Sequence, residues 1–405
     1  MTAVMQGVRI LEVADHTFVP AASALLADWG AEVIKIEHVE RGDAMRGLAS
    51  SGLAMLGGKV HVLLEHSNRG KRSLALNLNS KDGLDILYRL AATSDVFLTN
   101  KLPSVRAKLK IDVEHLRAHN PNIIYVRGTG QGARGPDADR GSYDSLAYWC
   151  RSGIALGMKQ PDDPAVPPPP GPAFGDSIGA MTIAGGIMGA LFHRERTGDA
   201  TIVDVSLLGT GLWSQGAALA LSLQLQRPWA PMPKGFSTGN PLVATYRTKD
   251  DRHLSFCCLQ GAKYWPGIGE VIGQPELASD ERFADAASLT KNAAVATQLL
   301  TAAFAERTAA EWRERLASFS GQWAMVQNTL EASVDPQTVA NGYVVDCQTA
   351  DGTPFKLAAA PVQFDEQTAI RARAPEFNEH GDAILTELGL DMDAIIDLKA
   401  RGIVA

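Results

Sequence analysis

The sequence has few cysteines, and none of them forms a metal-binding pattern. There are four cysteines in 405 residues, and no two of them form a C-x-x-C pair. Such thiols are typical of a cytosolic protein in which cysteines stay reduced. We therefore expect no zinc site, and unpaired thiols at Cys150, Cys257, Cys258 and Cys347.

Signals for secretion or membrane insertion are also missing. Residues Met1–Gly7 lack a cationic stretch followed by an apolar run, so we expect no signal peptide. The longest Gly/Ala-rich apolar stretch, Ser177–Phe192, is too short and too rich in glycine to predict a membrane span. The net charge of −7, with both signs interspersed, argues against nucleic-acid binding. These features predict a cytoplasmic protein with neither nucleic-acid nor membrane partners.

Several catalytic fingerprints are absent as well. The segment Ala14–Pro20 (ADHTFVP), which follows the first expected strand, contains no G-x-G-x-x-G. There is no Walker A motif, no H-E-x-x-H and no G-x-S-x-G. Motifs alone therefore leave an α/β enzyme with a small-molecule ligand.

Alternating strand and helix signals fill the first half of the chain. Gly7–Val13 is a β-branched run, Ala21–Gly30 has helical spacing, and Glu32–Glu37 is a second β-rich run. Such βαβ units imply a parallel sheet with crossover helices, and hence a Rossmann-like open α/β domain. The pattern continues with strands expected at 73–78, 95–99 and 123–127 and helices at 81–92 and 112–119.

The second half predicts a smaller α+β domain. The proline-rich stretch 162–172 excludes helix and central strand. A long helix is expected over Ser177–Arg194, with Gly185, Gly186 and Gly189 suited to close packing. Hairpins are expected around Lys249–Asp251 and near residues 351–352. Helices are expected at 209–225, 263–272, 291–305, 309–319, 382–388 and 392–401, and the predicted boundaries are 1–226 (large domain), 227–335 (small domain) and 336–405 (C-terminal segment).

A set of ordered phrases resembles the family III CoA-transferases, the CaiB/BaiF family that includes formyl-CoA transferase. Each phrase alone is a weak signal, but their order over nearly the whole chain is specific. They are LLADWGAEVIKIE at 25–37, GDAMRG at 42–47, NRGKRSL at 68–74, DVFLTN at 95–100, ERTG at 195–198, VDVS at 203–206, RAP at 373–375, EH at 379–380 and LTELG at 385–389.

The resemblance implies that Asp176 is the nucleophile. It lies in the phrase GPAFGDS at 171–177, which is similar to the nucleophile segment of formyl-CoA transferase. In such enzymes the aspartate attacks an acyl-CoA and forms a mixed anhydride and then an aspartyl-CoA thioester. We expect amide donors and a helix dipole to keep this carboxylate ionised. From the residues alone, Asp176 could instead merely cap the helix that begins near Ser177.

The resemblance also implies positions that bind or orient the CoA thioester. Asp144, in GSYD at 141–144, orients the active site or caps a loop. Relatives carry glutamine at the position of Thr17, which argues against formate or oxalate chemistry here, and arginine at the positions of His38 and Lys108. The implied CoA-binding residues are Thr17, Phe18, His38, Leu76, Asn77, Asn79, Asn100, Lys101, Lys108, Arg140 and Tyr143, with neither a metal nor a redox cofactor.

Further implications concern the acyl pocket, the loop Gly235–Pro241 and the assembly. Apolar candidates for an acyl pocket, each equally suited to the core, are Phe18, Met45, Leu48, Met55, Trp149 and Phe236. The loop is either a lid over the site or an interdomain linker. The C-terminal segment is expected to return to the large domain, and two chains to interlock as a homodimer.

Two other functions remain open from the sequence. An α-methylacyl-CoA racemase shares this fold, but the G-H-D phrase of those relatives reads GSYD at 141–144, without histidine. A non-catalytic protein that binds CoA or acyl-CoA is the second alternative, and retention of Asp176 argues against it.

Overall fold

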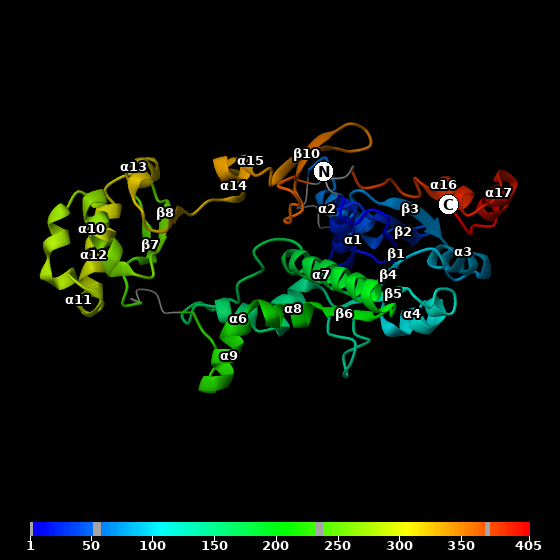
Figure 1. Cartoon of the computed structure of the whole chain (residues 1–405), viewed down its shortest axis with the longest axis horizontal. Coiled ribbons are helices and arrows are strands. Elements are labelled where there is room, and N and C mark those ends of the chain that lie inside the picture. The colour runs from blue at the N-terminus through cyan, green and yellow to red at the C-terminus, as the bar shows by residue number, and fades with distance from the viewer. Residues whose placement is uncertain (1–2, 52–57, 232–237, 369–372) are drawn as a thin grey trace. The chain divides into compact units, whose positions relative to one another are not determined.

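The computed structural model describes residues 3–51, 58–231, 238–368 and 373–405 (Figure 1). The chain divides into two compact units. The first comprises Met1–Pro231 and Gln337–Ala405, and the second comprises Met232–Pro336. The C-terminal segment therefore belongs to the same unit as the first half of the chain.

A parallel sheet of six strands, counted over the described residues, forms the centre of the first unit. Its strand order is β3-β2-β1-β4-β5-β6, so the order reverses between β1 and β4. In open α/β sheets, ligands bind beyond the carboxyl ends of the strands at such a reversal. The predicted α/β class is confirmed, with β1 (Arg9–Val13), β2 (Glu32–His38), β3 (Arg72–Leu76), β4 (Val96–Thr99), β5 (Ile124–Thr129) and β6 (Ile202–Ser206).

Helices cover both faces of this sheet. Successive strand side chains point to opposite faces, so Ile10 joins one core and Leu11 the other. On the Ile10 face α1 packs against α7, and Ile183 of α7 is fully buried. On the Leu11 face, Leu87 of α3 and Leu398 of α17 belong to one core. The bounds are α1 (Phe18–Asp28), α3 (Lys81–Ala91), α5 (Val113–Arg117), α7 (Phe174–Thr197), α16 (Gly381–Glu387) and α17 (Met392–Ala400).

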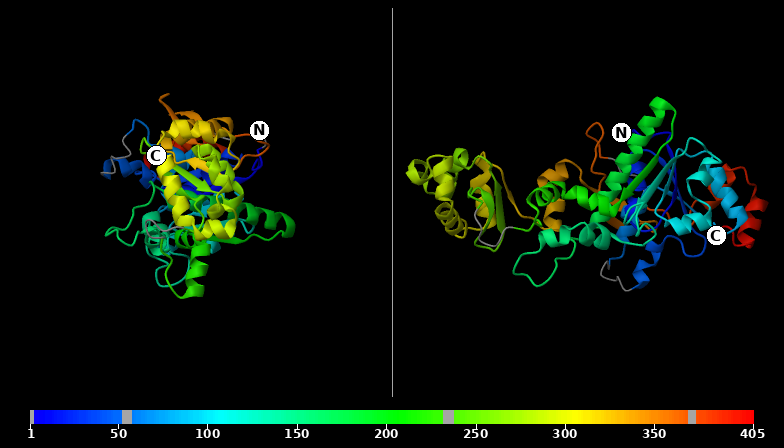
Figure 2. Two further views of the ribbon diagram at one scale, coloured as in Figure 1. Left: turned by 90° about the vertical axis from the view of Figure 1, so that its left-hand side faces the viewer. Right: turned by 90° about the horizontal axis from the view of Figure 1, so that it is seen from below.

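The C-terminal helices lie beside α3 and the β3 edge of the sheet (Figure 2). Arg401 pairs with Asp82 at the start of α3, at 2.6 Å. The amide of Asn77 donates to the carbonyl of Ile403, at 2.9 Å. The end of the chain thus covers the segment that follows β3, where several CoA-binding residues were expected.

Shorter elements complete the first unit. The hairpin expected near residues 351–352 is present, with β10 (Val344–Gln348) antiparallel to β11 (Pro354–Ala358). The π-helical segment η3 covers Ser145–Arg151 and the 3-10 segment η1 covers Ala44–Ser51. The other helices are α2 (Val62–Asn68), α4 (Pro103–Leu109), α6 (Ile154–Met158), α8 (Leu207–Ser214), α9 (Gly216–Leu225) and α15 (Pro336–Ala340).

The second unit has an antiparallel sheet covered by helices. The hairpin expected around Lys249–Asp251 joins β7 to β8, and β9 pairs with β8. Trp265, Phe304 and Trp312 are fully buried in its core. Its elements are β7 (Val243–Arg247), β8 (His253–Cys257), α10 (Gly261–Ile272), η4 (Pro275–Ser279), η5 (Glu281–Phe283), α11 (Ala286–Lys291), α12 (Ala293–Phe304), α13 (Ala309–Arg315), η6 (Leu316–Ser318), β9 (Trp323–Met325) and α14 (Thr329–Val334).

Helix α7 differs from the expectation in length and in its glycines. It starts at Phe174 and runs for 24 residues, and an 18-residue stretch within it has a mean hydropathy of 1.2. By length and composition alone this helix could cross a membrane, contrary to the expectation for this stretch, although the core helix of a soluble protein meets the same criteria. Its buried side chains pack against α1 in the core. Over the described residues, nothing lies within 4 Å of a Cβ built at Gly185 or Gly189. The glycines in tight contact are Gly186, as expected, together with Gly175 and Gly179.

Candidate active site

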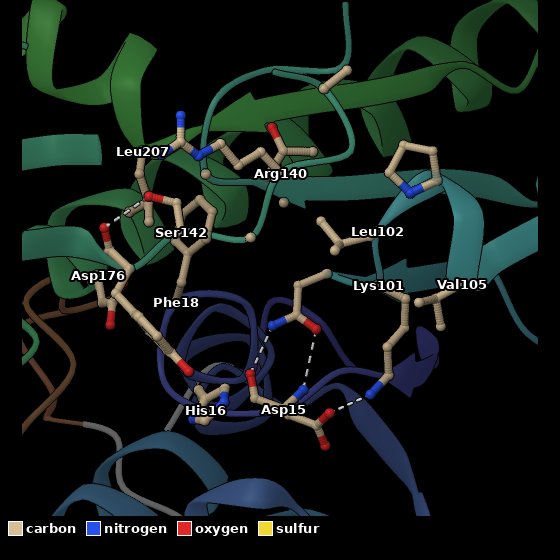
Figure 3. A pocket seen from close by; sticks show the side chains of 18 residues that line it. Asp15, His16, Phe18, Lys101, Leu102, Val105, Arg140, Ser142, Asp176 and Leu207 are labelled. Carbon is tan, nitrogen blue, oxygen red and sulfur yellow. Dashed lines mark hydrogen bonds and ion pairs between the residues drawn. The ribbon is translucent and has the colours of Figure 1, made fainter. Parts of the chain in front are cut away.

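A cavity of about 370 Å³ opens at the reversal between β1 and β4 (Figure 3). Asp15 follows β1, Asn100 follows β4, and Gly130 follows β5, so residues beyond the carboxyl ends of three neighbouring strands form its wall. Asp176, from the first turn of α7, lines the same cavity. The expected site residues that line it are Phe18, Asn100, Lys101, Arg140, Tyr143 and Asp176. We call it the reaction cavity.

Asp176 does not cap α7. The helix begins at Phe174, and its N-cap is Ala173, at φ +56°. Asp176 is therefore the third helical residue, and no donor among the described residues bonds to its carboxylate. Burial, with a smaller effect from the nearby Asp144 carboxylate, raises the pKa of Asp176 to about 7. The expectation that local donors keep it ionised was wrong, because burial and a neighbouring negative charge disfavour the charged form.

Asp144 joins the start of η3 to the start of α7. Its carboxylate accepts hydrogen bonds from the amide of Ser145 at 2.7 Å and from the amide of Gly175 at 3.1 Å. Asp144 thus supplies the capping oxygen for the helix that carries Asp176. Asp144 itself does not line the reaction cavity, and its described contacts connect it to the chemistry through the helix end that carries Asp176.

Phe18 forms part of the cavity wall through two close glycine contacts. A Cβ built at Gly179, one turn after Asp176, would lie 2.4 Å from Cε2 of Phe18. A Cβ built at Gly128 of β5 would lie 3.1 Å from Cε1 of Phe18 and 2.1 Å from Cγ2 of Val19. Only glycine leaves room for the ring in this position.

The turn after β1 is held by both side-chain and ring contacts. The amide side chain of Asn100 accepts from the backbone of Asp15 at 3.2 Å and donates to its carbonyl at 2.7 Å. Lys101 forms an ion pair with the Asp15 carboxylate. His16 adopts φ +69° and meets the ring of Tyr143 edge-on, with centroids 5.4 Å apart. In this structure Asn100 therefore bonds to the protein's own backbone.

A second cavity of about 290 Å³ lies next to the reaction cavity. The two share Asp15 and Lys101 in their walls. The expected CoA-binding residues that line it are His38, Leu76, Asn77, Asn79 and Lys101. The second cavity extends from these shared residues to the end of β2, and we call it the nucleotide cavity.

The nucleotide cavity contains a cation that the sequence did not reveal. Arg41 lines it, three residues after His38. The Nδ1 atom of His38 faces the backbone amides of Glu40 at 3.2 Å and Arg41 at 3.4 Å, so it acts as an acceptor. Asp15 and His16 of the reaction cavity were also missed, although they directly follow the first strand, where sheet topology places a ligand.

Several expected residues lie outside both cavities. Thr17 is buried, with 2% of its surface exposed, and Lys108 is exposed on α4. Met45 and Trp149 are buried without lining either cavity, and Leu48 lines neither. Met55, Phe236 and residues 235–237 of the Gly235–Pro241 loop fall outside the described residues. In the described ranges no group of three or more His, Cys, Asp or Glu side chains is arranged to hold a metal ion.

Known proteins resemble this chain over nearly its whole length. The model of CoA-transferase family III matches residues 5–381. The chain is 27% identical over 402 residues to (R)-2-hydroxy-4-methylpentanoate CoA-transferase of Clostridioides difficile, covering 99% of each sequence. It is 28% identical to cinnamoyl-CoA:phenyllactate CoA-transferase of Clostridium sporogenes, covering 98% of this chain and 96% of the relative.

Solved structures agree with this assignment. The crystal structure of a CaiB/BaiF family protein from Brucella suis matches with a TM-score of 0.79 and 28% identity, covering 96% of this chain and all of that one. The resemblance seen in the ordered sequence phrases is thereby confirmed. The chain belongs to CoA-transferase family III.

Proposed function

We propose that this enzyme transfers CoA from an acyl-CoA donor to a carboxylic acid, with Asp176 as the nucleophile. The observation that carries the proposal is a half-buried carboxylate on the wall of the reaction cavity, with a pKa near 7. A carboxylate with few hydrogen-bond partners keeps its lone pairs available for attack. Family III membership supports the same reaction class.

The proposed reaction has two symmetric halves. An oxygen of ionised Asp176 attacks the thioester carbonyl, the C–S bond breaks, and CoA thiolate leaves behind a mixed anhydride. The thiolate then attacks the aspartyl carbonyl, which releases the donor acid and leaves an aspartyl-CoA thioester. The acceptor carboxylate reverses both steps and departs as the new acyl-CoA. No net proton is consumed, and Asp176 returns as a carboxylate.

The covalent intermediate can be mapped directly. After incubation with an acyl-CoA and no acceptor, we expect a CoA adduct on the peptide that contains Asp176, sensitive to hydroxylamine. The Asp176→Asn variant should carry none, and an Asp346→Asn variant, altered at an exposed acid of β10, should carry the normal amount. An adduct on another residue would disprove the assignment of the nucleophile.

We further propose that the acid that receives CoA carries an apolar side chain. The reaction cavity has an apolar wall formed by Phe18, Leu102, Val105 and Leu207. The names of the two relatives given above contain 2-hydroxy acids with a branched or an aromatic side chain. A competition assay with 4-methylpentanoate, its 2-hydroxy form and glutarate, read by mass spectrometry of the CoA thioesters, tests this. Preference for glutarate would contradict the proposal.

We also propose a homodimer, as the family resemblance implies. Helix α9 (GAALALSLQL) is apolar along most of its length, yet none of its residues is buried in the single chain. Trp213 of α8 is 86% exposed and Leu223 of α9 is 64% exposed. Apolar helices without a covered face commonly mark an interface. Light scattering after size-exclusion chromatography should give twice the 43.2 kDa chain mass, and Leu223→Glu should reduce it.

A cytoplasmic location stays part of the proposal. All four cysteines are unpaired in the structure, and reduced thiols are typical of reducing compartments. Cell fractionation with an antibody against the protein would test this location.

A further inference from the structure

Four fully buried charged side chains lie beneath the turn that follows β1. Lys71 bonds to Glu12 at 2.8 Å, Glu12 to Lys35 at 2.8 Å, and Lys35 to Asp43 at 2.7 Å. We call these four residues the buried tetrad. None of them lines either cavity. Two are acids and two are bases, and burial lowers the pKa of one base, Lys71, to about 7.

The tetrad bonds to the main chain of one short segment. Lys35 Nζ donates to the carbonyl of Ala14 at 2.8 Å. The Asp43 carboxylate accepts from the amide of His16 at 3.0 Å. Lys71 Nζ donates to the carbonyl of Pro20 at 2.8 Å. These three contacts span residues 14–20, the segment that carries Asp15, His16 and Phe18 into the reaction cavity.

Stability alone does not explain why charged side chains occupy the positions of the buried tetrad. Buried ion pairs lose their hydration, and well-packed apolar side chains often serve stability equally well. Burial opposes the charge on Lys35, but the carboxylates of Asp43 and Glu12 outweigh it and raise the pKa of Lys35. Burial likewise opposes the charge on Asp43, yet Lys35 and two backbone amides hold its pKa low. Both groups therefore stay charged, and a shift of the turn would take the Ala14 carbonyl away from Lys35 and the His16 amide away from Asp43.

The segment that they hold contains a backbone conformation that does not form readily by itself. His16 lies at φ +69°, in the left-handed region that side chains other than glycine rarely adopt. The hydrogen bond from the His16 amide to the Asp43 carboxylate stabilises that backbone conformation. The same Asp43 oxygen also accepts from the amide of Met45 at 2.8 Å, so the turn is tied to the 42–45 loop as well.

We infer that Asp43 and Lys35 are positioning residues for CoA transfer, which hold the Ala14–His16 turn in the shape that lines the reaction cavity. The inference rests on the proposed function for its link to catalysis, whereas its structural half can be tested without turnover. Neither residue touches substrate in this account. Asp43 acts through His16, and Lys35 acts through Ala14 and Asp43.

Asp43→Asn is the sharpest perturbation. All described partners of the Asp43 carboxylate are donors, namely Lys35 and the amides of His16 and Met45. An amide side chain has only one acceptor oxygen, so it cannot serve both Lys35 and the two amides. The matched control is Asp28→Asn, which removes an acid from the buried Asp28–Arg69 pair, 2.8 Å apart, away from this turn.

Hydrogen–deuterium exchange tests the structural half on the full-length protein. We expect the peptide that covers residues 14–20 to exchange about tenfold faster in Asp43→Asn, and at the normal rate in Asp28→Asn. Unchanged exchange in Asp43→Asn would overturn the inference. This readout stays valid even if the nucleophile is not Asp176.

Kinetics test the catalytic half. A small misplacement near reacting atoms can lower a rate by roughly a hundredfold. We expect kcat per folded Asp43→Asn enzyme to fall about 10–100-fold. KM for the acyl-CoA should change less, by up to about threefold, because much of the nucleotide cavity wall, including His38, Leu76 and Asn79, lies on β2, on β3 and just after β3 rather than on this turn. Equal loss of kcat in Asp28→Asn would show a general stability effect and would overturn the positioning role.

A double variant keeps the test informative if Asp43→Asn folds poorly. Lys35→Met combined with Asp43→Asn leaves Glu12 paired with Lys71, so charge balance returns. We expect its melting temperature to recover relative to Asp43→Asn, while kcat stays low and exchange over residues 14–20 stays fast. Recovery of kcat together with stability would contradict the inference.

Discussion

Asp176 and Asp43 are carboxylic acids near the turn that follows β1, but the groups that surround them are opposite in kind. Asp176 has no bonded donor among the described residues and lies near Asp144, and its pKa rises to about 7. Asp43 is also buried, but Lys35 and the amides of His16 and Met45 surround it, and its pKa falls. Burial favours the neutral form of both carboxyl groups. It raises the pKa of Asp176 because no donor in the described part of the chain opposes it, whereas the donors around Asp43 outweigh it and make Asp43 a fixed structural anion.

The largest expected effect is loss of transfer when the reactive carboxylate is removed. We expect Asp176→Ala to lower kcat by at least about 10⁴-fold, since removal of a covalent nucleophile typically costs this much or more. The measurement is CoA exchange between two acids under saturating substrate. Activity within tenfold of the wild type would remove Asp176 from the mechanism.

Replacing each of the two aspartates by asparagine should change the free energy of unfolding in opposite directions. Asp43→Asn breaks a buried ion pair and should lower the free energy of unfolding by about 3–5 kcal/mol. Asp176→Asn should raise it at pH 8, because ionised Asp176 opposes folding. One pKa unit is worth about 1.4 kcal/mol, so the gain is at most roughly 4 kcal/mol and is reduced by partial exposure.

The pH dependence of that gain has a defined sign. Asp176 has a pKa of about 7 in the folded protein and 3.8 when unperturbed, so the folded state binds more protons between these values. Stability from this group is complete below pH 3.8 and is lost as pH rises through 7. The advantage of Asp176→Asn should therefore shrink toward pH 4 in denaturant titrations. An advantage independent of pH would contradict a raised pKa.

Transfer itself should depend on pH through the same group. Only ionised Asp176 can attack, so kcat/KM should fall about tenfold per pH unit below pH 7, or about a hundredfold by pH 5. Asp144→Asn removes the neighbouring negative charge, so it should move this acidic limb to lower pH. A limb that stays in place would show that Asp144 does not influence the nucleophile.

The smallest expected effect concerns the wall beside Asp176. Gly179→Ala places a methyl group against the Phe18 ring, with 2.4 Å available. We expect a loss of stability of about 1–3 kcal/mol from overpacking and a lower kcat/KM for bulky acyl groups than for acetyl-CoA. Gly185→Ala on the same helix, where the space is open in the described structure, is the control. It should leave transfer unchanged and raise stability by up to about 1 kcal/mol, since alanine favours the helix over glycine.

The sheet could be predicted from sequence because its strands are buried runs of apolar residues. All residues of Val96–Thr99 are buried, and all but the last are apolar. Strand β6 was missed although three of its five residues are β-branched, a signal typical of a strand. It is a short strand at the sheet edge with no fully buried residue. Helix α2, only seven residues long, gives too short a periodic signal to detect.

The site could be predicted only in part. The ordered phrases pointed to Asp176, but its raised pKa depends on burial by distant segments and on Asp144, which local sequence does not contain. Arg41 and His16 were missed because their place in the cavities follows from the strand order. The reversal between β1 and β4 was the signal that could have found His16, since it directly follows β1.

Direct titration of the Asp176 carboxyl tests the central claim. Carbon-13 NMR of aspartate-labelled protein, with Asp176→Asn used to assign the resonance, would give its pKa without substrate. We expect a pKa near 7 for Asp176. The pKa of Asp43 should lie below the ordinary range of an aspartate. A value for Asp176 of about 4 or lower, which is ordinary for aspartate, would contradict the contrast between the two carboxylates.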